Sequence, residues 1–165
     1  MGYKEYVVDN CGKLWDKCKK WGKTNMLIGE YKHTIDSKKR LSLPVKFRKE
    51  LGKKVIVTRG FESCLVVYPE NEWKLVLDQL RALPSGRAES RKFSRAVLGG
   101  AIEVNLDKLG RILIPDYLKT YAGLKKNVAV CGLSNKLEIW DESKWEAYRK
   151  NAEQAIDKVA EDLGI

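Results

Sequence analysis

The alternation of apolar and polar residues predicts several short strands along the chain. Within residues 28–35 the side chains alternate, with Tyr31 and Ile35 on one side, as is typical of a strand with one buried face. Two valine-rich runs, 54–58 and 64–68, are separated by five residues and predict a hairpin. Strands of this length, interrupted by helical patterns, indicate the α+β class.

Five helices are predicted where apolar residues recur every three or four positions. Two are short, and we expect each to have a proline as its first helical residue and a glycine as its stop, from Pro44 to Gly52 and from Pro115 to Gly123. The three longer helices are expected over 70–83, 87–98 and 142–163.

The apolar stripes of these helices predict which side chains face inward. In the second short helix, Leu118 and Tyr121 are expected to repeat the packing of Phe47 and Leu51 in the first. Helix 87–98 is expected to turn Phe93, Ala96 and Val97 inward. The last helix has an apolar stripe long enough to leave room for packing against a second subunit, formed by Trp145, Tyr148, Ala152, Ile156, Val159 and Leu163.

A five-residue turn occurs twice in the chain. Asp36 to Arg40 and Asp107 to Arg111 each open with an acid, close with an arginine, and precede an apolar run that ends in proline. The two copies are 71 residues apart (107 − 36), and the flanking segments match at similar offsets. A fixed offset of this kind indicates a duplicated structural unit. Two copies are too few for a solenoid and suit a pseudo-two-fold pair packed face to face.

The duplication predicts the organisation of the chain. Two equivalent units are expected over 30–77 and 101–144, joined by a helical connector over 78–100. A C-terminal helix over 145–165 follows the second unit, and residues 1–25 form an extension with no counterpart in the repeat.

The net charge narrows the choice of partner. A formal charge of +10 and an isoelectric point near 9.4 favour a polyanion, above all nucleic acid, over the alternative of a generic solvated basic surface. The chain has no apolar run long enough to cross a bilayer and no secretory signal pattern. We therefore expect a cytoplasmic protein with no membrane partner.

Cysteine and histidine usage argues against a metal site and against catalysis. None of the four cysteines forms a C-x-x-C pair, and His33 is the single histidine, so we expect no zinc site. Cys64 and Cys131 are expected to be buried thiols in a reducing compartment. The chain has no glycine-rich phosphate loop and no nucleophile signature, and His33 is expected to be packed. We predict that the protein is not an enzyme and has no cofactor.

The repeated turn has the side chains that DNA recognition needs. A short turn projects its side chains from a rigid pair of strands, and an arginine fork can bind guanine O6 and N7 in the major groove. The acid can accept backbone N–H bonds and can pair with the arginine, while lysines between them suit phosphates. The alternative without a function is a surface Asp–Arg pair that only shapes a turn. Its duplication in a basic chain counts against this alternative. The predicted base readers are Arg40 and Arg111, the turn-positioning residues Asp36 and Asp107, and the phosphate-binding residues Lys38, Lys39 and Lys108.

In these turns the chain resembles the MraZ family, whose two halves are units of the SpoVT–AbrB class. Supporting stretches are 65–69 with Trp73, 91–99, and 137–141 with Trp145. The resemblance covers about residues 26–150. It implies a tandem pair of swapped-hairpin units that form a pseudo-two-fold double barrel with flanking helices.

The resemblance also implies a function. It points to a nucleoid-associated, DNA-binding transcriptional regulator, mainly a repressor, of its own operon of division and cell-wall genes. Such proteins read short G-rich direct repeats as closed homo-oligomeric rings with no cofactor. This chain departs from the family pattern at Lys39, where glycine is usual, as at Gly110. If that position needs a positive φ, lysine carries a strain cost.

Residues 1–25 allow three interpretations: a basic arm, a disordered tail, or upstream DNA translated by mistake. The implied operator has a TGGG core, and Trp15-Asp16 and Trp21-Gly22 must be encoded by DNA that contains TGGGA and TGGGG. A third core at Cys11-Gly12, if its codons allow, would start about one DNA turn before the Trp15 core. We predict that part of this segment is translated operator and that Met26 is the physiological start.

Two further functions stay open at this point. One is an antitoxin or transition-state regulator of the same fold class, which normally needs one such unit per chain. The other is a ring-forming scaffold that binds polyanions without sequence preference. Two covalent copies count against the antitoxin hypothesis. A steep fall of DNA affinity with salt, together with a preference for G-rich repeats, separates specific regulation from generic polyanion binding.

Overall fold

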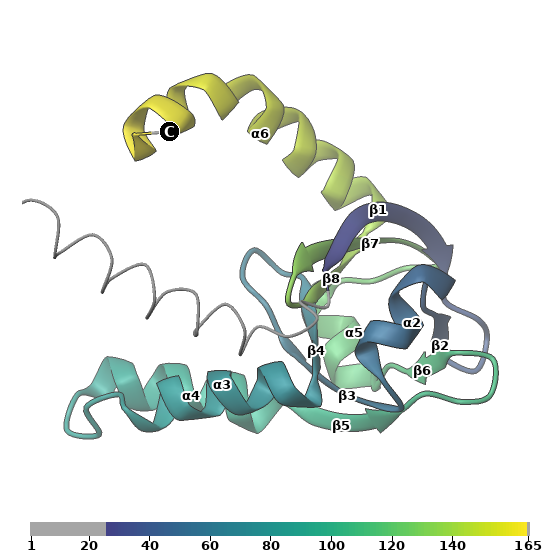
Figure 1. The fold of residues 1–165 in the computed structure, drawn as a ribbon, viewed down its shortest axis with the longest axis horizontal. Coiled ribbons are helices and arrows are strands. Elements are labelled where there is room, and N and C mark those ends of the chain that lie inside the picture. Colours follow the sequence, from purple (N-terminus) through teal and green to yellow (C-terminus); the bar gives the residue numbers. More distant parts are fainter. Residues whose placement is uncertain (1–25, 165) are drawn as a thin grey trace, which may run out of the picture.

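The computed structural model describes residues 26–164, so the predictions for residues 1–25 lie outside the described part of the chain (Figure 1). It contains strands β1 (Leu27–Thr34), β2 (Arg40–Ser42), β3 (Lys54–Arg59), β4 (Leu65–Pro69), β5 (Ile102–Asn105), β6 (Arg111–Leu113), β7 (Asn127–Ser134) and β8 (Leu137–Asp141). The helices are α2 (Val45–Leu51), α3 (Glu70–Arg81), α4 (Ala88–Gly100), α5 (Asp116–Ala122) and α6 (Glu142–Leu163). The predicted α+β class is therefore confirmed.

Strands of the two halves of the chain pair with one another. The larger sheet is antiparallel with the order β1-β7-β8-β4-β3-β5. Its strands β1, β3 and β4 in the first half correspond to β5, β7 and β8 in the second. Exchanging each strand with its counterpart reverses this order and leaves the same sheet, which is the behaviour of a pseudo-two-fold pair. The duplication seen in the sequence is thus also present in the topology.

The remaining two strands lie close to the pseudo-two-fold axis. β2 pairs with β6 antiparallel, and the central pair is Leu41 with Ile112. These residues are sequence equivalents, 71 positions apart, so the axis passes between them. Both are completely buried. The ribbon therefore links the two turns, which flank it, through the shared core.

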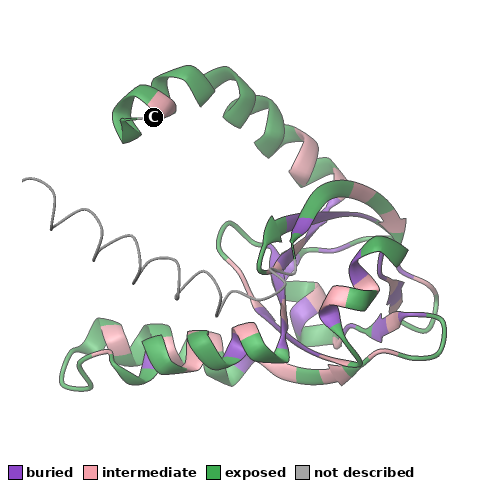
Figure 2. Cartoon of the chain, in the orientation of Figure 1, coloured by how far each residue is buried: buried purple, intermediate pink, exposed green. Residues whose placement is uncertain are grey.

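The main core lies between the larger sheet, the β2–β6 ribbon and the two short helices. Its apolar side chains come from both halves, and Phe47 of α2 meets Tyr31 of β1 edge to face at 5.2 Å. Figure 2 shows this buried part as one body, with the longer helices exposed. Burial of this common core holds both turns to one rigid base.

A second, smaller cluster covers the outer face of the sheet. Trp140 of β8 packs there with Cys64 and Cys131, and burial raises the pKa of both thiols to about 12. These two cysteines are buried free thiols, as predicted. The aromatic rings of Trp145 and Tyr148 join this cluster from the first turns of α6.

Three local predictions are corrected. Pro44 and Pro115 are the N-cap residues, with extended ψ angles of 133° and 151°, and each helix begins one residue later. Ala122, not Tyr121, repeats Leu51, since it is the residue 71 positions on and is buried. Tyr121 is instead partly exposed and donates a hydrogen bond to the carbonyl oxygen of Gly60 at 2.7 Å.

The inward face predicted for α4 is also wrong in part. Phe93 and Ala96 are exposed, and only Val97 is half-buried. The physical reason is that this side of α4 lines an open cavity between the α3–α4 pair and the sheet, which the described residues do not fill. Periodicity marked the apolar side of the helix correctly, but that side is largely uncovered.

Candidate nucleic-acid interface

The first repeated turn is closed by its leading aspartate. One carboxylate oxygen of Asp36 accepts hydrogen bonds from the backbone N–H groups of Lys38 and Arg40, both at 2.9 Å. The backbone adds reciprocal bonds, from Lys39 N to Asp36 O at 2.9 Å and from Asp36 N to Arg40 O at 2.9 Å. This is the Asx-type turn that the sequence predicted.

The second turn repeats these bonds. Asp107 Oδ1 accepts from the N–H groups of Leu109 and Arg111, both at 2.9 Å. Gly110 N donates to Asp107 O at 2.9 Å, and Asp107 N donates to Arg111 O at 3.0 Å. Two segments with different residues between the acid and the arginine therefore adopt one geometry.

In each turn the second carboxylate oxygen holds the arginine. Asp36 Oδ2 lies 2.8 Å from Arg40 Nε and 2.7 Å from Nη2, and Asp107 Oδ2 lies 2.7 Å from Arg111 Nε. The ion pair uses two of the five N–H groups of Arg40, so three remain that it does not use. The guanidinium is thus oriented while keeping donors for another acceptor.

The same bonds set the acidity of the two carboxyl groups. The hydrogen bond from the Arg40 side chain is the main cause that lowers the pKa of Asp36 below its usual value. For Asp107, the backbone N–H of Arg111 is the main cause of a lowered pKa, and its side chain adds to it. Both acids are held as carboxylates, the form that orients arginine.

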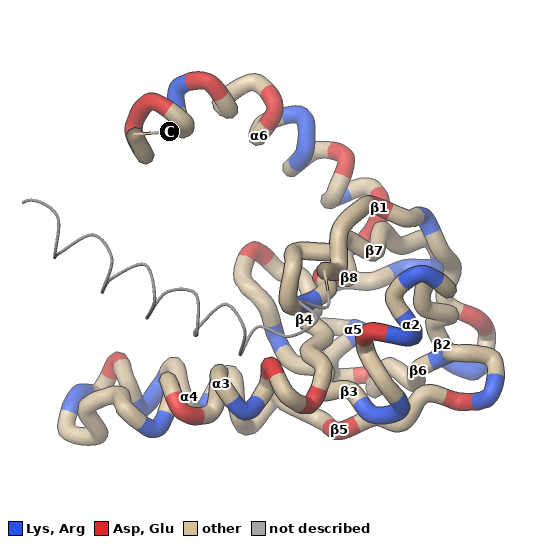
Figure 3. The backbone as a smooth tube through the Cα atoms, viewed as in Figure 1, with Lys and Arg blue, Asp and Glu red and all other residues tan. Residues whose placement is uncertain are grey.

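The two turns are bound to each other as well as to the core. Leu43 N donates to Gly110 O at 3.0 Å, and Ile114 N donates to Lys39 O at 2.9 Å. These bonds are pseudo-two-fold equivalents and extend the β2–β6 ribbon at both ends. Both turns project from the end of the molecule opposite α3 and α4, and charged residues gather along them (Figure 3). Two arginine-bearing turns thus share one end in a fixed relation.

The backbone position before each arginine has a positive φ. Lys39 has a φ of 60° and Gly110 a φ of 70°, so the condition under which lysine carries a strain cost is met. Glycine adopts this region without cost, whereas lysine is strained by about 1–2 kcal/mol. The first turn keeps the geometry of the second despite this strain.

The lysines of the two turns differ in what they contact. Lys38 and Lys108 are exposed, as a phosphate contact requires. The amine of Lys39 instead lies 2.5 Å from a carboxylate oxygen of Asp116 at the start of α5. A phosphate would have to compete with this exposed ion pair, so the DNA-binding role of Lys39 stays a prediction.

One residue that supports the second turn was not predicted from the sequence. Arg48 of α2 donates to the Leu43 carbonyl at 2.8 Å and to the Ser42 hydroxyl at 3.0 Å. Its side chain occupies the space beside Gly110, where a Cβ would collide with it. Arg48 therefore braces the second turn from the first unit. No sequence signal separates it from the other basic residues of α2.

The other candidate chemistry is not assembled into a site. His33 is partly buried on β1, and its pKa is lowered mainly by burial, with a smaller contribution from Arg48. Within residues 26–164 no group of three or more histidines, cysteines or acids could hold a metal ion. No helix in the same range is long and apolar enough to span a membrane.

Comparison with known proteins gives a consistent result. The profile of the family described as "MraZ protein, putative antitoxin-like" matches twice, over residues 26–96 and 97–164. The chain is 46% identical over 138 residues to "Transcriptional regulator MraZ" of Natranaerobius thermophilus, covering 84% of this chain and 96% of that protein. Proteins of the same name from Leuconostoc citreum and Syntrophomonas wolfei are 48% and 42% identical, covering 84% and 85% of this chain and 96% and 100% of theirs.

Proposed function

Because the chain belongs to the MraZ family, we propose that it is a sequence-specific DNA-binding regulator that reads short G-rich direct repeats through its two arginine turns. One observation carries the proposal: two turns of the same hydrogen-bonded geometry orient Arg40 and Arg111 at one end of a chain with a net charge of +10. A surface ion pair that only shaped a turn would not need to occur twice in a fixed relation.

The geometry of the turns supports a proposed role for each of their charged residues. Arg40 and Arg111 bind guanines, and Asp36 and Asp107 aim them by holding the Nε edge of each guanidinium. Lys38 and Lys108 bind phosphates, and Lys39 joins them when it exchanges Asp116 for DNA. Arg48 acts as a brace and makes no base contact in this scheme.

The regulated target is the chain's own operon, which it mainly represses. The proteins it resembles are named transcriptional regulators. On this proposal the protein is cytoplasmic and nucleoid-associated, has no enzymatic activity, and acts as a closed homo-oligomeric ring. A single turn offers few base contacts, so a ring gains affinity by presenting many turns at high effective concentration.

The proposal extends to the fold and the division of the chain. Residues 30–77 and 101–144 are two swapped-hairpin units that form one double barrel, with 78–100 as connector and 145–165 as C-terminal helix. Pairing of β1 with β7 and of β3 with β5 supports this, because each half completes the sheet of the other. In residues 1–25, translated operator DNA remains the proposal, which N-terminal sequencing of the native protein tests.

A second function is favoured by the family description, which includes "antitoxin-like". An antitoxin of this fold class would bind DNA through the same turns and would also bind a toxin protein. A complex with a protein made from a neighbouring gene, seen when this chain is isolated from cells and missing when that gene is deleted, would favour this alternative.

Fluorescence anisotropy tests the main proposal. The probe is DNA from just upstream of the Met26 codon, either intact or with its TGGG cores scrambled, at physiological salt. Wild type is expected to prefer the intact DNA, and Arg40→Ala or Arg111→Ala is expected to lose about 1–3 kcal/mol of that preference for each guanine contact. Lys74→Ala, an exposed charge change on α3, is the matched control and should retain it.

The opposite result is equally clear. If wild type binds both DNAs equally and neither arginine variant changes the affinity, charge alone carries the binding. The proposed base readout would then be wrong, and a scaffold with generic polyanion binding would take its place.

A further inference from the structure

The distal part of α6 presents an uncovered apolar surface. None of the residues of this 22-residue helix is buried, and Ile156, Val159 and Leu163 are 62%, 48% and 69% exposed. They lie on the same stripe, one or two turns apart. Figure 2 shows almost the whole helix exposed beyond its base. An amphipathic helix with its apolar side in water is expected to have a partner.

The first turns of α6 are fixed to the sheet, so the helix projects in a defined direction. Trp145 and Tyr148 pack against Trp140 in tilted ring contacts, with ring centroids 5.6 and 5.0 Å from that of Trp140. Lys32 of β1 reaches Glu142 at 2.7 Å and Glu146 at 2.9 Å. These contacts set the direction in which the remaining turns of the helix project from the sheet (Figure 1).

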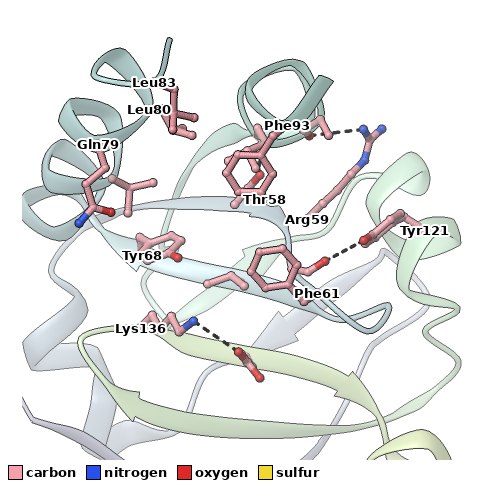
Figure 4. A pocket seen from close by; sticks show the side chains of 16 residues that line it. Thr58, Arg59, Phe61, Tyr68, Gln79, Leu80, Leu83, Phe93, Tyr121 and Lys136 are labelled. Carbon is pink, nitrogen blue, oxygen red and sulfur yellow. Dashed lines mark hydrogen bonds and ion pairs between the residues drawn. The ribbon is translucent and has the colours of Figure 1, made fainter. Parts of the chain in front are cut away.

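The same chain has an apolar groove elsewhere on its surface. A cavity of about 550 Å³ opens between the α3–α4 pair and the outer face of the sheet (Figure 4). Its apolar lining includes Leu80, Leu83 and Val97. At its rim Phe61 and Phe93 stack at 6.1 Å, and they are 71% and 41% exposed. Exposed aromatic rings beside an apolar groove are typical of protein–protein interfaces.

The charges of the two surfaces are opposite. Residues 151–163 of α6 contain four acids and one lysine, a net charge of −3. Helix α4 contains Arg91, Lys92 and Arg95 against the single acid Glu89, a net charge of +2. Opposite charges around matching apolar surfaces favour their association and set its orientation.

We propose that the distal half of α6 of one copy docks into the α3–α4 groove of a second copy. The inference rests on the proposed ring and names the contact that builds it. The two surfaces are different, so the contact is head-to-tail, and repetition of such a contact closes into a ring when its rotation allows. Each copy gives one helix and receives one, and the arginine turns lie at the end of the molecule away from the groove.

Two full-length variants and their mixture test the contact. Phe93→Glu places a charge in the groove but leaves α6 unchanged, whereas the double variant Ile156→Glu, Val159→Glu blocks α6 but leaves the groove unchanged. Since these side chains are exposed in the single chain, both variants should fold, which circular dichroism checks. By light scattering each variant alone should have the mass of one chain. Mixed one to one they should form a species of two chains and nothing larger, because only one contact remains possible.

Each matched control either changes the same position as a test variant or adds an acid to the same helix. Phe93→Leu keeps the groove apolar and should assemble as wild type does. Gln154→Glu adds an acid on the side of α6 opposite the stripe and should also assemble, since that residue lies about 180° from the stripe.

Several results would overturn the proposal. A double α6 variant that keeps the wild-type mass would show that α6 is not the docking element. A folded mixture in which every molecule stays a single chain would show that the two surfaces are not partners. Loss of assembly on deletion of residues 1–25 would assign the groove to that segment. A wild-type assembly that shows no preference for G-rich DNA would remove the proposed regulatory function but leave this interface standing.

Discussion

At the scale of single residues, the equivalent positions Lys39 and Gly110 show how one backbone geometry tolerates different side chains. Both have a positive φ, and a Cβ added at Gly110 would collide with the side chain of Arg48. Position 39 accommodates the Cβ of a lysine, whereas position 110 has no room for a Cβ. The two turns therefore have the same backbone geometry but different neighbours beside the residue that precedes the arginine.

This difference predicts unequal responses to substitution at the two positions. Gly110→Ala is expected to lower the free energy of unfolding by about 2–4 kcal/mol, because it strains the backbone and displaces Arg48 from two hydrogen bonds. Lys39→Gly relieves strain and loses only an exposed ion pair, so it should stay within about 1 kcal/mol of wild type. Urea unfolding measures both, and equal losses for the two variants would contradict the assigned role of Arg48.

The turn carboxylates predict a pH dependence of stability. The pKa of Asp107 is lowered in the folded protein, so its contribution is fully present above the unfolded pKa of about 3.9 and is lost as the pH falls through the folded pKa. Asp107→Asn cannot ionise and should be less stable than wild type at neutral pH, with a difference that shrinks on acidification. Unfolding measured from neutral pH down to acid checks this. A difference that stays constant would show that charge on Asp107 is unimportant.

At the scale of secondary-structure elements, the sequence predicted which segments are strands and helices better than which segments pair. Alternation correctly assigns the exposed and buried sides of β1, because that property is local. Pairing of β1 with β7 is set by contacts between residues about 100 positions apart, which local periodicity does not encode. Periodicity identified the apolar side of α4. It does not determine whether an apolar stripe faces the core of its own chain or another molecule.

The candidate site was predictable for a related reason. The Asp–Arg turn is local and occurs twice, so its position and internal bonds could be inferred from spacing alone. The Lys39 contact with Asp116 and the brace from Arg48 connect different elements and became visible only in the folded arrangement. Sequence reasoning therefore identified the arginines and acids of the site but not what supports them.

The pairing of β1 with β7 depends on a close approach at Gly132. A Cβ on this residue would lie 2.7 Å from the backbone of Leu27, where no side chain can move aside. Gly132→Ala should therefore weaken this ladder, lower the free energy of unfolding by about 1–3 kcal/mol, and speed amide hydrogen exchange in β1. Gly99→Ala is the control, since open space surrounds Gly99 in α4 and alanine favours a helix. Equal exchange in wild type and Gly132→Ala would contradict the close approach.

At the scale of the whole molecule, the arrangement separates the proposed DNA contact from the proposed self-association. The arginine turns lie at one end, while the exposed apolar surfaces of α4 and α6 lie on the parts that extend from the other (Figures 1 and 3). A variant that disrupts one of these surfaces should therefore leave the other function intact. This separation makes it possible to measure how much of the DNA affinity comes from assembly.

Titration of DNA with one or three G-rich repeats measures that contribution. Wild type should bind three repeats spaced by about 10 base pairs at least tenfold more tightly than one, because neighbouring subunits meet the same face of the duplex. Changing the spacing by half a turn should remove most of the gain, as the middle repeat then faces away. The single-chain variant Phe93→Glu should bind one repeat as wild type does but gain little from three, since its turns are no longer linked. If it keeps the full gain, DNA itself assembles the subunits, and the α6 contact is not the source of cooperativity.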